Sequence, residues 1–358
     1  MNQFQPLDLD EPPTKHKWSL RTTVLTIIFS LAAITGIMVG AVEGSKPARY
    51  PNYRPLDYRL VDTYAGSSFF DMFDYFTESD PTGGFVRYVN ASTALTQNLT
   101  TTTTTTTPNR ALLRVDDQTA YTPTGRASIR LESKARYDNG LFIFDIMHTP
   151  HGCGTWPALW LTDGYNWPVN GEIDVLEAVN NGTDGNAVTL HTSPGCHMGG
   201  VKRVQTGEVV HAACGNSSDG GVGCGVRGGP GTFGREMNMG GGGIYALDLR
   251  PEGIRAWFFP RASMPPDLGI ADRNIPPDPS TWGQPLADFP NTECDIMGHF
   301  RNLSIIVNID LCGEWAGKRE VYTEQFSCPG TCEEFVAGNP GAFREAFWEF
   351  GGFWVYQV

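Results

Sequence analysis

The run Gly171-Glu172-Ile173-Asp174-Val175-Leu176-Glu177 places three carboxylates within one short apolar segment. Glu172 and Asp174 are two residues apart, so on a β-strand their side chains point to the same face. Glu177 is five residues from Glu172, and this odd spacing would turn it to the opposite face of a regular strand. One extra residue at Val175-Leu176, a β-bulge, would return Glu177 to the face of the other two acids. We therefore expect a bulged strand with three acids on one face and apolar residues packed behind it.

Three acids on one face of a hydrophobic strand carry a cost, because like charges raise one another's pKa. A pair of carboxyl groups in different protonation states, one ionised nucleophile and one protonated acid, is what hydrolysis of a glycosidic bond requires. An acidic surface strand without chemistry is the alternative interpretation. The spacing of the acids alone does not choose between the two.

The surrounding sequence favours the catalytic interpretation. Upstream lie Cys153-Gly154-Thr155-Trp156-Pro157-Ala158-Leu159-Trp160 and Tyr165-Asn166-Trp167-Pro168, and downstream lie Ala178-Val179-Asn180 and Thr189-Leu190-His191-Thr192. With the bulged E-x-D-x-x-E spacing, this region resembles the catalytic strand of glycoside hydrolase family 16, in particular the fungal endo-1,3(4)-β-glucanases of the laminarinase type. The resemblance extends from Ser67 to Gln357 and includes Trp257-Phe258-Phe259-Pro260-Arg261 and Cys312-Gly313-Glu314-Trp315-Ala316-Gly317.

This resemblance implies a role for each acid: Glu172 as nucleophile, Glu177 as general acid/base, and Asp174 hydrogen-bonded to the nucleophile. It also implies a glucan cleft whose substrate-binding candidates are Trp160, Trp167, His191, Asn180 and Trp315. Indole rings suit this role, because sugar rings have apolar C–H faces. Core packing is the alternative for each tryptophan, and a structural role is the alternative for the histidine. One departure is Tyr245-Ala246-Leu247-Asp248-Leu249, where relatives usually carry Glu-Trp, and it puts one contact of the cleft wall in doubt.

The hydrophobic pattern of the C-terminal body has a period of two. Short strand-like runs are bounded by Gly, Pro or Asn at Ser128–Glu132, Leu141–Met147, Ile244–Leu249, Arg255–Phe259 and Ser304–Ile309. Many short strands with turn signals predict an all-β sandwich. The family resemblance sharpens this to a concanavalin-like β-jelly roll over residues 59–358, with residues 172–177 on a concave inner sheet.

The N-terminal region predicts a membrane anchor. The run Val24–Val42 is uncharged, mostly apolar and long enough to cross about 30 Å of hydrocarbon as a helix. Lys15, Lys17 and Arg21 precede it, so we expect a cytosolic tail (residues 1–21), a transmembrane signal anchor (22–42) and a stalk (43–58). The protein would be a single-pass type II membrane protein with a lumenal or extracellular body. A cleaved signal peptide is the alternative, although its apolar core should be shorter; Gly36 and Gly40 give weak support for a homodimer.

Two further features agree with an external body. All eight cysteines follow the apolar run, and in an oxidising compartment they could form four disulfides: Cys153, Cys196, Cys214, Cys224, Cys294, Cys312, Cys328 and Cys332. Zinc binding at Cys328-x3-Cys332 is the alternative, but no second close pair follows. N-x-S/T sequons begin at Asn90, Asn98, Asn181, Asn216 and Asn302. No cofactor and no metal site are expected, although a structural cation is possible.

Composition and two biased tracts complete the predictions. The net charge of −13 argues against nucleic acid as a partner and suits a neutral polysaccharide. We expect the threonine run at residues 100–107 to form a surface loop, and the glycine-rich residues 220–243 to form a long loop beside the cleft.

The sequence thus predicts an enzyme of the cell surface or wall that hydrolyses β-1,3 or mixed β-1,3-1,4 glucan internally, with retention and a glycosyl-enzyme intermediate. A glucan transglycosylase of the same fold is one alternative, because only the acceptor differs. A glucan-binding surface protein without catalysis is another, but it leaves the complete set of acids unexplained.

Overall fold

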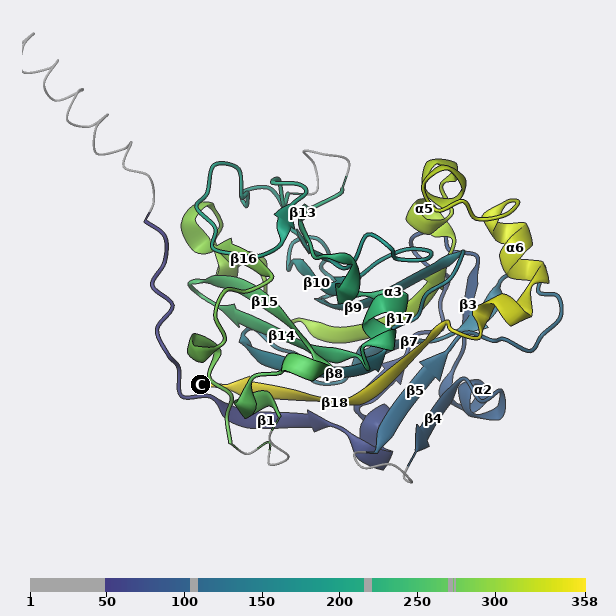
Figure 1. Ribbon diagram of the computed structural model, residues 1–358, viewed down its shortest axis with the longest axis horizontal. Helices are drawn as coiled ribbons and strands as arrows, with labels where there is room; N and C mark the ends of the chain where they lie inside the picture. Colours follow the sequence, from purple (N-terminus) through teal and green to yellow (C-terminus); the bar gives the residue numbers. More distant parts are fainter. Residues whose placement is uncertain (1–48, 104–108, 216–220, 270–272, 274) are drawn as a thin grey trace, which may run out of the picture. The chain divides into compact units, whose positions relative to one another are not determined.

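The computed structural model of the chain describes residues 49–103, 109–215, 221–269, 273 and 275–358 (Figure 1). The predicted tail and anchor, the first part of the stalk, Asn216 and Thr104–Thr107 lie outside these residues. Within the described ranges, no helix has both the length and the apolar character needed to cross a membrane.

Two antiparallel β-sheets lie one above the other (Figure 1). The first, here called the back sheet, has the spatial order β16 (Ala287–Pro290), β15 (Gly253–Pro260), β14 (Gly243–Arg250), β8 (Gly140–His148), β18 (Phe347–Gln357), β5 (Arg110–Arg114) and β4 (Thr100–Thr103), with β1 (Arg59–Tyr64) also paired to β18. The second, the front sheet, has the order β12 (Glu208–Val209), β13 (Cys224–Arg227), β11 (Ala187–His191), β10 (Glu172–Glu177), β9 (Thr155–Thr162), β17 (Ser304–Leu311), β7 (Arg130–Ser133) and β2 (Phe73–Tyr75). The predicted strands are all present, and the all-β jelly-roll sandwich is confirmed.

The main core fills the space between the sheets. On β8, Phe142, Phe144 and Ile146 face this core, whereas Leu141 and Ile143 belong to a second cluster on the outer side of the back sheet. That cluster also includes Tyr58, Trp257 and Trp282 from the segments that cover it. Because β8 is apolar on both faces, its sequence reads as a continuous hydrophobic run.

Short elements connect the strands. A parallel pair, β3 (Val86–Tyr88) with β6 (Arg126–Ser128), lies apart from the two sheets. The α-helices are α2 (Ala91–Thr96), α3 (Gly234–Met239), α4 (Ile296–His299), α5 (Gly313–Ala316) and α6 (Cys332–Gly338). The remaining helical turns are η1 (Gly66–Met72), η2 (Pro230–Thr232), η3 (Arg261–Ser263), η4 (Pro266–Leu268), η5 (Pro279–Thr281), η6 (Asn291–Glu293), η7 (Glu320–Gln325) and η8 (Pro340–Phe343).

All eight cysteines form disulfides, as the sequence analysis predicted. The pairs are Cys153–Cys328, Cys196–Cys294, Cys214–Cys224 and Cys312–Cys332. Cys328 and Cys332 bond to different partners, so the zinc alternative for this pair is wrong. Two of the bridges tie the segment that carries η7 and α6 to residues beside the front sheet, Cys153 just before β9 and Cys312 just after β17.

Three predicted loops or linkers differ from the structure. Thr100–Thr103 is not a surface loop but the edge strand β4, because its backbone pairs with β5 while Thr100 is buried. Residues 224–239 are not one long loop, since they form β13, η2 and α3. The end of the predicted stalk packs against the back sheet, where Tyr50 and Tyr53 donate hydrogen bonds to Asp288 and Tyr58 donates one to Asp248.

Candidate active site

Strand β10 carries the three acids, and its register shifts where the sequence predicted a bulge. Asp174 pairs with Trp160 of β9, but the next pairs are Leu176 with Leu159 and Glu177 with Ala158. The ladder to β11 shifts at the same place. Val175 and Leu176 are consecutive, yet both are fully buried in the core between the sheets. The bulge is therefore confirmed, and it returns Glu177 to the open face of the front sheet, opposite the core.

The buried side-chain amide of Asn186 forms hydrogen bonds with the backbone on both sides of the bulge. The backbone N–H of Glu177 donates to Asn186 Oδ1 at 2.8 Å, and Asn186 Nδ2 donates to the carbonyl oxygen of Val175 at 2.9 Å. Asn186 is fully buried and lies immediately before β11. Because buried backbone groups need partners, this side chain replaces the ladder hydrogen bonds that the bulge removes. Asn186 was not predicted, since nothing in its local sequence marks it as a partner of β10.

Burial dominates the electrostatics of the three acids. It raises the pKa of Glu172 to about 8, with Asp174 adding repulsion and His191 acting in the opposite direction. Burial also raises the pKa of Asp174 to about 8. For Glu177, burial and repulsion from Asp174 raise the pKa to about 8, against a hydrogen bond from Trp156. Near neutral pH the group therefore retains protons, as a site that needs a general acid requires.

His191 lies opposite Glu172 on β11 and contacts two of the acids. Its Nε2 atom is 3.3 Å from Asp174 Oδ2 and 3.8 Å from Glu172 Oε1. The hydrogen bond predicted between Asp174 and Glu172 is not among those of the described residues, where Asp174 Oδ2 has the ion-pair contact to His191 instead. The charge of His191 lowers the pKa of both Glu172 and Glu177, against the effect of burial, but its close contacts are with Glu172 and Asp174.

Trp156 is the functional residue that the sequence analysis overlooked. Its indole Nε1–H donates to Glu177 Oε1 at 2.7 Å. The Trp315 ring packs edge-on against the Trp156 ring, with ring centroids 5.7 Å apart. Trp156 is four residues before Trp160 on β9, so even spacing already placed the two on one face. Trp156 therefore orients the acid, while Trp315 also lines a small hollow of about 70 Å³ at Glu177.

The two predicted platform tryptophans differ in exposure. Trp160 is half-buried; its indole N–H donates to Asn308 Oδ1 at 2.9 Å, and the Arg130 guanidinium lies over its ring. Trp167 is 44 % exposed, and its hydrogen bond lowers the pKa of Glu172. Trp167 thus has free ring surface near Glu172, as a sugar platform needs.

Comparison with known proteins agrees with this geometry. The family model described as "XgeA-like, catalytic GH16 domain" matches residues 73–356, which include the three acids of β10, His191 and the four tryptophans of the site. The chain belongs to glycoside hydrolase family 16. Membership makes it a glycoside hydrolase, and the three acids of β10 are its candidate catalytic group.

Relatives within family 16 match most of the described chain. A probable glycosidase of Schizosaccharomyces pombe is 43 % identical over 86 % of this chain and 71 % of its own length. The endo-1,3(4)-β-glucanase xgeA of Emericella nidulans is 37 % identical over 84 % of this chain, but the chain spans only 48 % of that protein.

Solved structures agree as well. Laminarinase 16A from Phanerochaete chrysosporium, which holds β-glucans in its donor and acceptor sites, shares 40 % identity with a TM-score of 0.78, covering 84 % of this chain and 99 % of that chain. An elongating family 16 β-1,3-glucosyltransferase shares 37 % identity with a TM-score of 0.75, covering 84 % of this chain and all of that chain.

Two predictions about the family 16 cleft need correction. Asn180 is fully buried, where Oδ1 accepts the backbone N–H of Gly154 and Nδ2 donates to the carbonyl of Ala316. It therefore supports loops around Trp156 rather than binding substrate. Asp248 does not lie at a cleft wall, because β14 belongs to the back sheet and the Asp248 side chain bonds to Tyr58 and Arg255.

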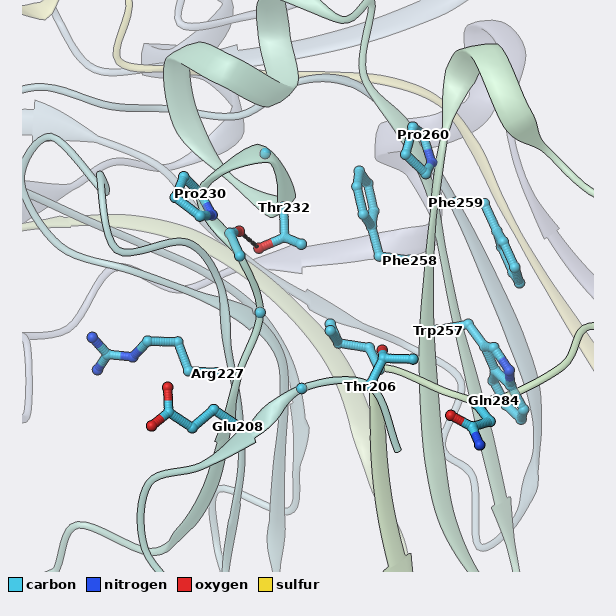
Figure 2. Close-up of a pocket in the computed structure, with 15 residues that line it drawn as sticks. Thr206, Glu208, Arg227, Pro230, Thr232, Trp257, Phe258, Phe259, Pro260 and Gln284 are labelled. Carbon is cyan, nitrogen blue, oxygen red and sulfur yellow. Dashed lines mark hydrogen bonds between the residues drawn. The ribbon is translucent and has the colours of Figure 1, made fainter. Parts of the chain in front are cut away.

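A larger groove of about 660 Å³ lies between β15 and the segments around β12 and β13 (Figure 2). Figure 2 shows Phe258 on the β15 side of the groove, whereas Pro230, Arg227 and Glu208 lie on the side away from β15. The groove contains none of the three acids. Size alone does not locate chemistry, so we place the reaction of this family 16 enzyme at β10.

Two groups of described side chains have donor atoms close enough to hold a metal ion. Glu172, Asp174 and His191 form one such group, but an ion there would occupy an oxygen of Glu172 and conflict with its predicted role as nucleophile. The other group, at His148, lies outside the acid site.

Proposed function

We propose that this protein is a retaining endo-hydrolase of β-1,3 or mixed β-1,3-1,4 glucan. The observation that carries the proposal is the bulge at Val175-Leu176, which brings Glu177 to the open face that also carries Glu172. The names of the relatives support the substrate class, since one acts on 1,3(4)-β-glucan and another holds β-glucans in two sites.

The proposed reaction proceeds by double displacement. A Glu172 oxygen attacks the anomeric carbon while Glu177 gives its proton to the departing glycosidic oxygen, and a glycosyl-enzyme forms. Glu177, now ionised, then takes a proton from water, whose oxygen attacks the anomeric carbon and releases Glu172. The Trp156 indole holds Glu177 in place throughout and stabilises its ionised form after the first step.

Product analysis tests this function. We expect laminarin and lichenan to give internal cleavage products, and the first product to carry the β-anomeric configuration by nuclear magnetic resonance. Cellulose should be a poor substrate. A first product of inverted configuration would contradict the assignment of Glu172 as nucleophile.

Transglycosylation is the second candidate function, because a β-1,3-glucosyltransferase of family 16 shares the fold at 37 % identity. In that case an acceptor sugar hydroxyl replaces water in the second step. Incubation of laminarioligosaccharides at low concentration distinguishes the two, since a transferase still makes products longer than the donor there, while in a hydrolase water outcompetes the sugar and the products are shorter. A protein that binds laminarin without either product would instead support a glucan-binding role.

We further propose a type II membrane topology with an N-glycosylated body outside the cytosol. The apolar run Val24–Val42 and the preceding basic residues support the anchor. Asn90, Asn98, Asn181 and Asn302 are exposed, but the Asn302 amide nitrogen donates to Asp163, so a glycan on Asn302 would break that bond. Protease treatment of sealed microsomes should remove only the short N-terminal tail. Digestion of the body, or a mature N-terminus near Gly44, would reject this topology.

A further inference from the structure

A second convergence of ligand-type side chains lies at one end of the back sheet. His148 is the last residue of β8, His151 follows in the turn toward β9, and Glu345 precedes β18. One donor atom from each lies within 4.8 Å of the other two. Figure 1 shows β8 and β18 side by side, and their pairing at His148 and Glu349 joins residues that are distant in sequence.

The His148 ring is held in a metal-ready orientation. It stacks on Phe347 with ring centroids 3.6 Å apart, and its Nδ1 lies 2.9 Å from the backbone oxygen of Phe347. Because a carbonyl oxygen can only accept, the hydrogen sits on Nδ1, and Nε2 is directed at Glu345 Oε2 at 3.2 Å. Metal-binding histidines typically use one ring nitrogen for a backbone carbonyl in this way and present the other to the ion.

The distances suit a tetrahedral ion. Bonds of about 2.0–2.1 Å from zinc separate neighbouring ligand atoms by roughly 3.4 Å, close to the distance between His148 Nε2 and Glu345 Oε2. The His151 ring lies beside that of His148, with centroids 6.1 Å apart, and its backbone N–H donates to the carbonyl of Glu345. The Glu345 side chain is 60 % exposed and can turn toward an ion that keeps water as its fourth ligand.

The surroundings favour neutral imidazoles. Burial lowers the pKa of His148, and burial together with the neighbouring His148 lowers that of His151. Glu349 adds negative charge near His148, while Arg235 is the positive charge acting on His151. An ion pair between protonated His148 and Glu345 is the competing explanation, but it leaves no role for the second imidazole.

We propose that His148, His151 and Glu345 bind one divalent transition-metal ion, with Zn²⁺ as the ion that two imidazoles and a carboxylate suit. The ion would tie the turn after β8 to the segment that leads into β18. That turn continues directly to Cys153 and to the strand that carries Trp156, so metal binding would steady one wall of the acid site. The proposal does not depend on which glucan the enzyme cleaves.

Calorimetric titration with ZnCl₂ tests the site on the full chain, purified without a polyhistidine tag. We expect the parent to bind one Zn²⁺, and His151→Ala and Glu345→Gln each to weaken binding by about tenfold or more. His197→Ala is the matched control, because His197 pairs with Glu293 at 3.9 Å on the surface and belongs to no metal-binding group among the described side chains. This control should bind as the parent does. With Cu²⁺ as the probe, electron paramagnetic resonance should show two coordinating nitrogens in the parent and one in His151→Ala.

Three outcomes would overturn the proposal. The parent could bind no Zn²⁺ at millimolar concentration, which would leave His148 and Glu345 as an ion pair only. Both variants could bind as tightly as the parent. Binding could instead be lost in His191→Ala, which would assign the ion to the acid site. Circular dichroism of each variant confirms that a lost signal is not lost folding.

Discussion

Two of the regions with buried carboxylates differ in the partners of those carboxylates. On the outer side of the back sheet, Asp248 accepts hydrogen bonds from Tyr58 and from the Arg255 guanidinium, both at 2.7 Å. Asp288 nearby accepts from Tyr50, Tyr53 and the backbone of Val204. The three acids of β10 have His191 and two indole N–H groups, but neither lysine nor arginine forms an ion pair with them among the described residues.

This difference in partners gives the buried carboxylates of the two regions different roles. Arginine and tyrosine donors compensate the charge of a back-sheet carboxylate, which then serves to hold the N-terminal segment on the sheet. On β10 burial is left largely uncompensated, so the carboxyl groups retain protons to a higher pH than usual. Only this second arrangement can deliver a proton to a leaving group near neutral pH.

Removal of an acid of β10 should have the largest effect. Glu172→Ala removes the nucleophile and should lower kcat on laminarin by at least about 10⁴-fold, with the fold intact by circular dichroism. Added azide should restore a product of inverted configuration. Glu177→Ala should still form a glycosyl-enzyme from a substrate with a good leaving group, and azide should release a product of retained configuration. If the two variants exchanged these behaviours, the roles of the two residues would be reversed.

The same kind of change in the back sheet should act on stability instead. Asp248→Ala leaves the Arg255 charge without its partner and should lower the free energy of unfolding by about 3–5 kcal/mol, measured by urea denaturation. Activity per folded molecule should be unchanged. The control is Glu324→Ala, because the Glu324 side chain is exposed and 3.5 Å from the exposed Arg319, and exposed pairs contribute about 0–1 kcal/mol. A comparable loss of unfolding free energy in both variants would show that the buried Asp248 pair stabilises the fold no more than an exposed pair does.

Asn186 tests whether the bulge positions the acid. Asn186→Asp keeps an oxygen for the Glu177 N–H but loses the N–H that Val175 needs, and we expect kcat/KM on laminarin to fall about 10²-fold. An aryl laminarioside with a good leaving group needs little help from an acid, so its kcat/KM should fall only a few-fold. Asn339→Ala is the control, since its amide bonds only to the nearby Phe335 carbonyl. An equal loss on both substrates would show that Asn186 acts through folding alone.

The smallest expected effect is on the pH dependence of stability. Glu177 has a pKa of about 8 in the folded protein, against an ordinary value of 4.5, so between these pH values the folded state binds more protons than the unfolded state. Stability should therefore fall as pH rises through this window, by up to about 1.4 kcal/mol per pH unit for one proton. Glu177→Gln should flatten this slope and raise stability at pH 7 by about 1–2 kcal/mol. Unfolding in urea at pH 5, 6, 7 and 8 measures both; an unchanged slope would mean that Glu177 is not desolvated in this way.

Much of the front sheet follows from local sequence. Glu172, Asp174 and Glu177 are close along the chain, and strand geometry makes their faces a matter of counting. The bulge at Val175-Leu176 is predictable for the same reason, because only one inserted residue reconciles the spacing with a shared face. The misassigned threonine run shows the limit of composition, since Thr100–Thr103 becomes a strand only because β5 lies beside it.

Residues that contact the acids but are distant from them along the chain could be identified only from the tertiary structure. Trp156 and Asn186 lie 21 and 9 residues from Glu177, and no local pattern reveals that their polar atoms meet it. Asn180 was predicted to bind substrate because it is close to the acids along the chain. Its side chain is instead buried inside the protein, which only the fold reveals. The disulfide pairing is likewise a property of the fold, since eight cysteines in sequence leave their partners open.

The sequence by itself therefore determined the identity and shared face of the acids and the alternation of the strands, because these depend on contacts within a few residues. The tertiary structure decided the electrostatic state of those acids, because desolvation comes from whatever the other strands and loops place around them. It also decided which buried carboxylates receive a compensating cation: Arg255 reaches Asp248 from the neighbouring strand β15, whereas β9 and β11 bring tryptophan and histidine to β10.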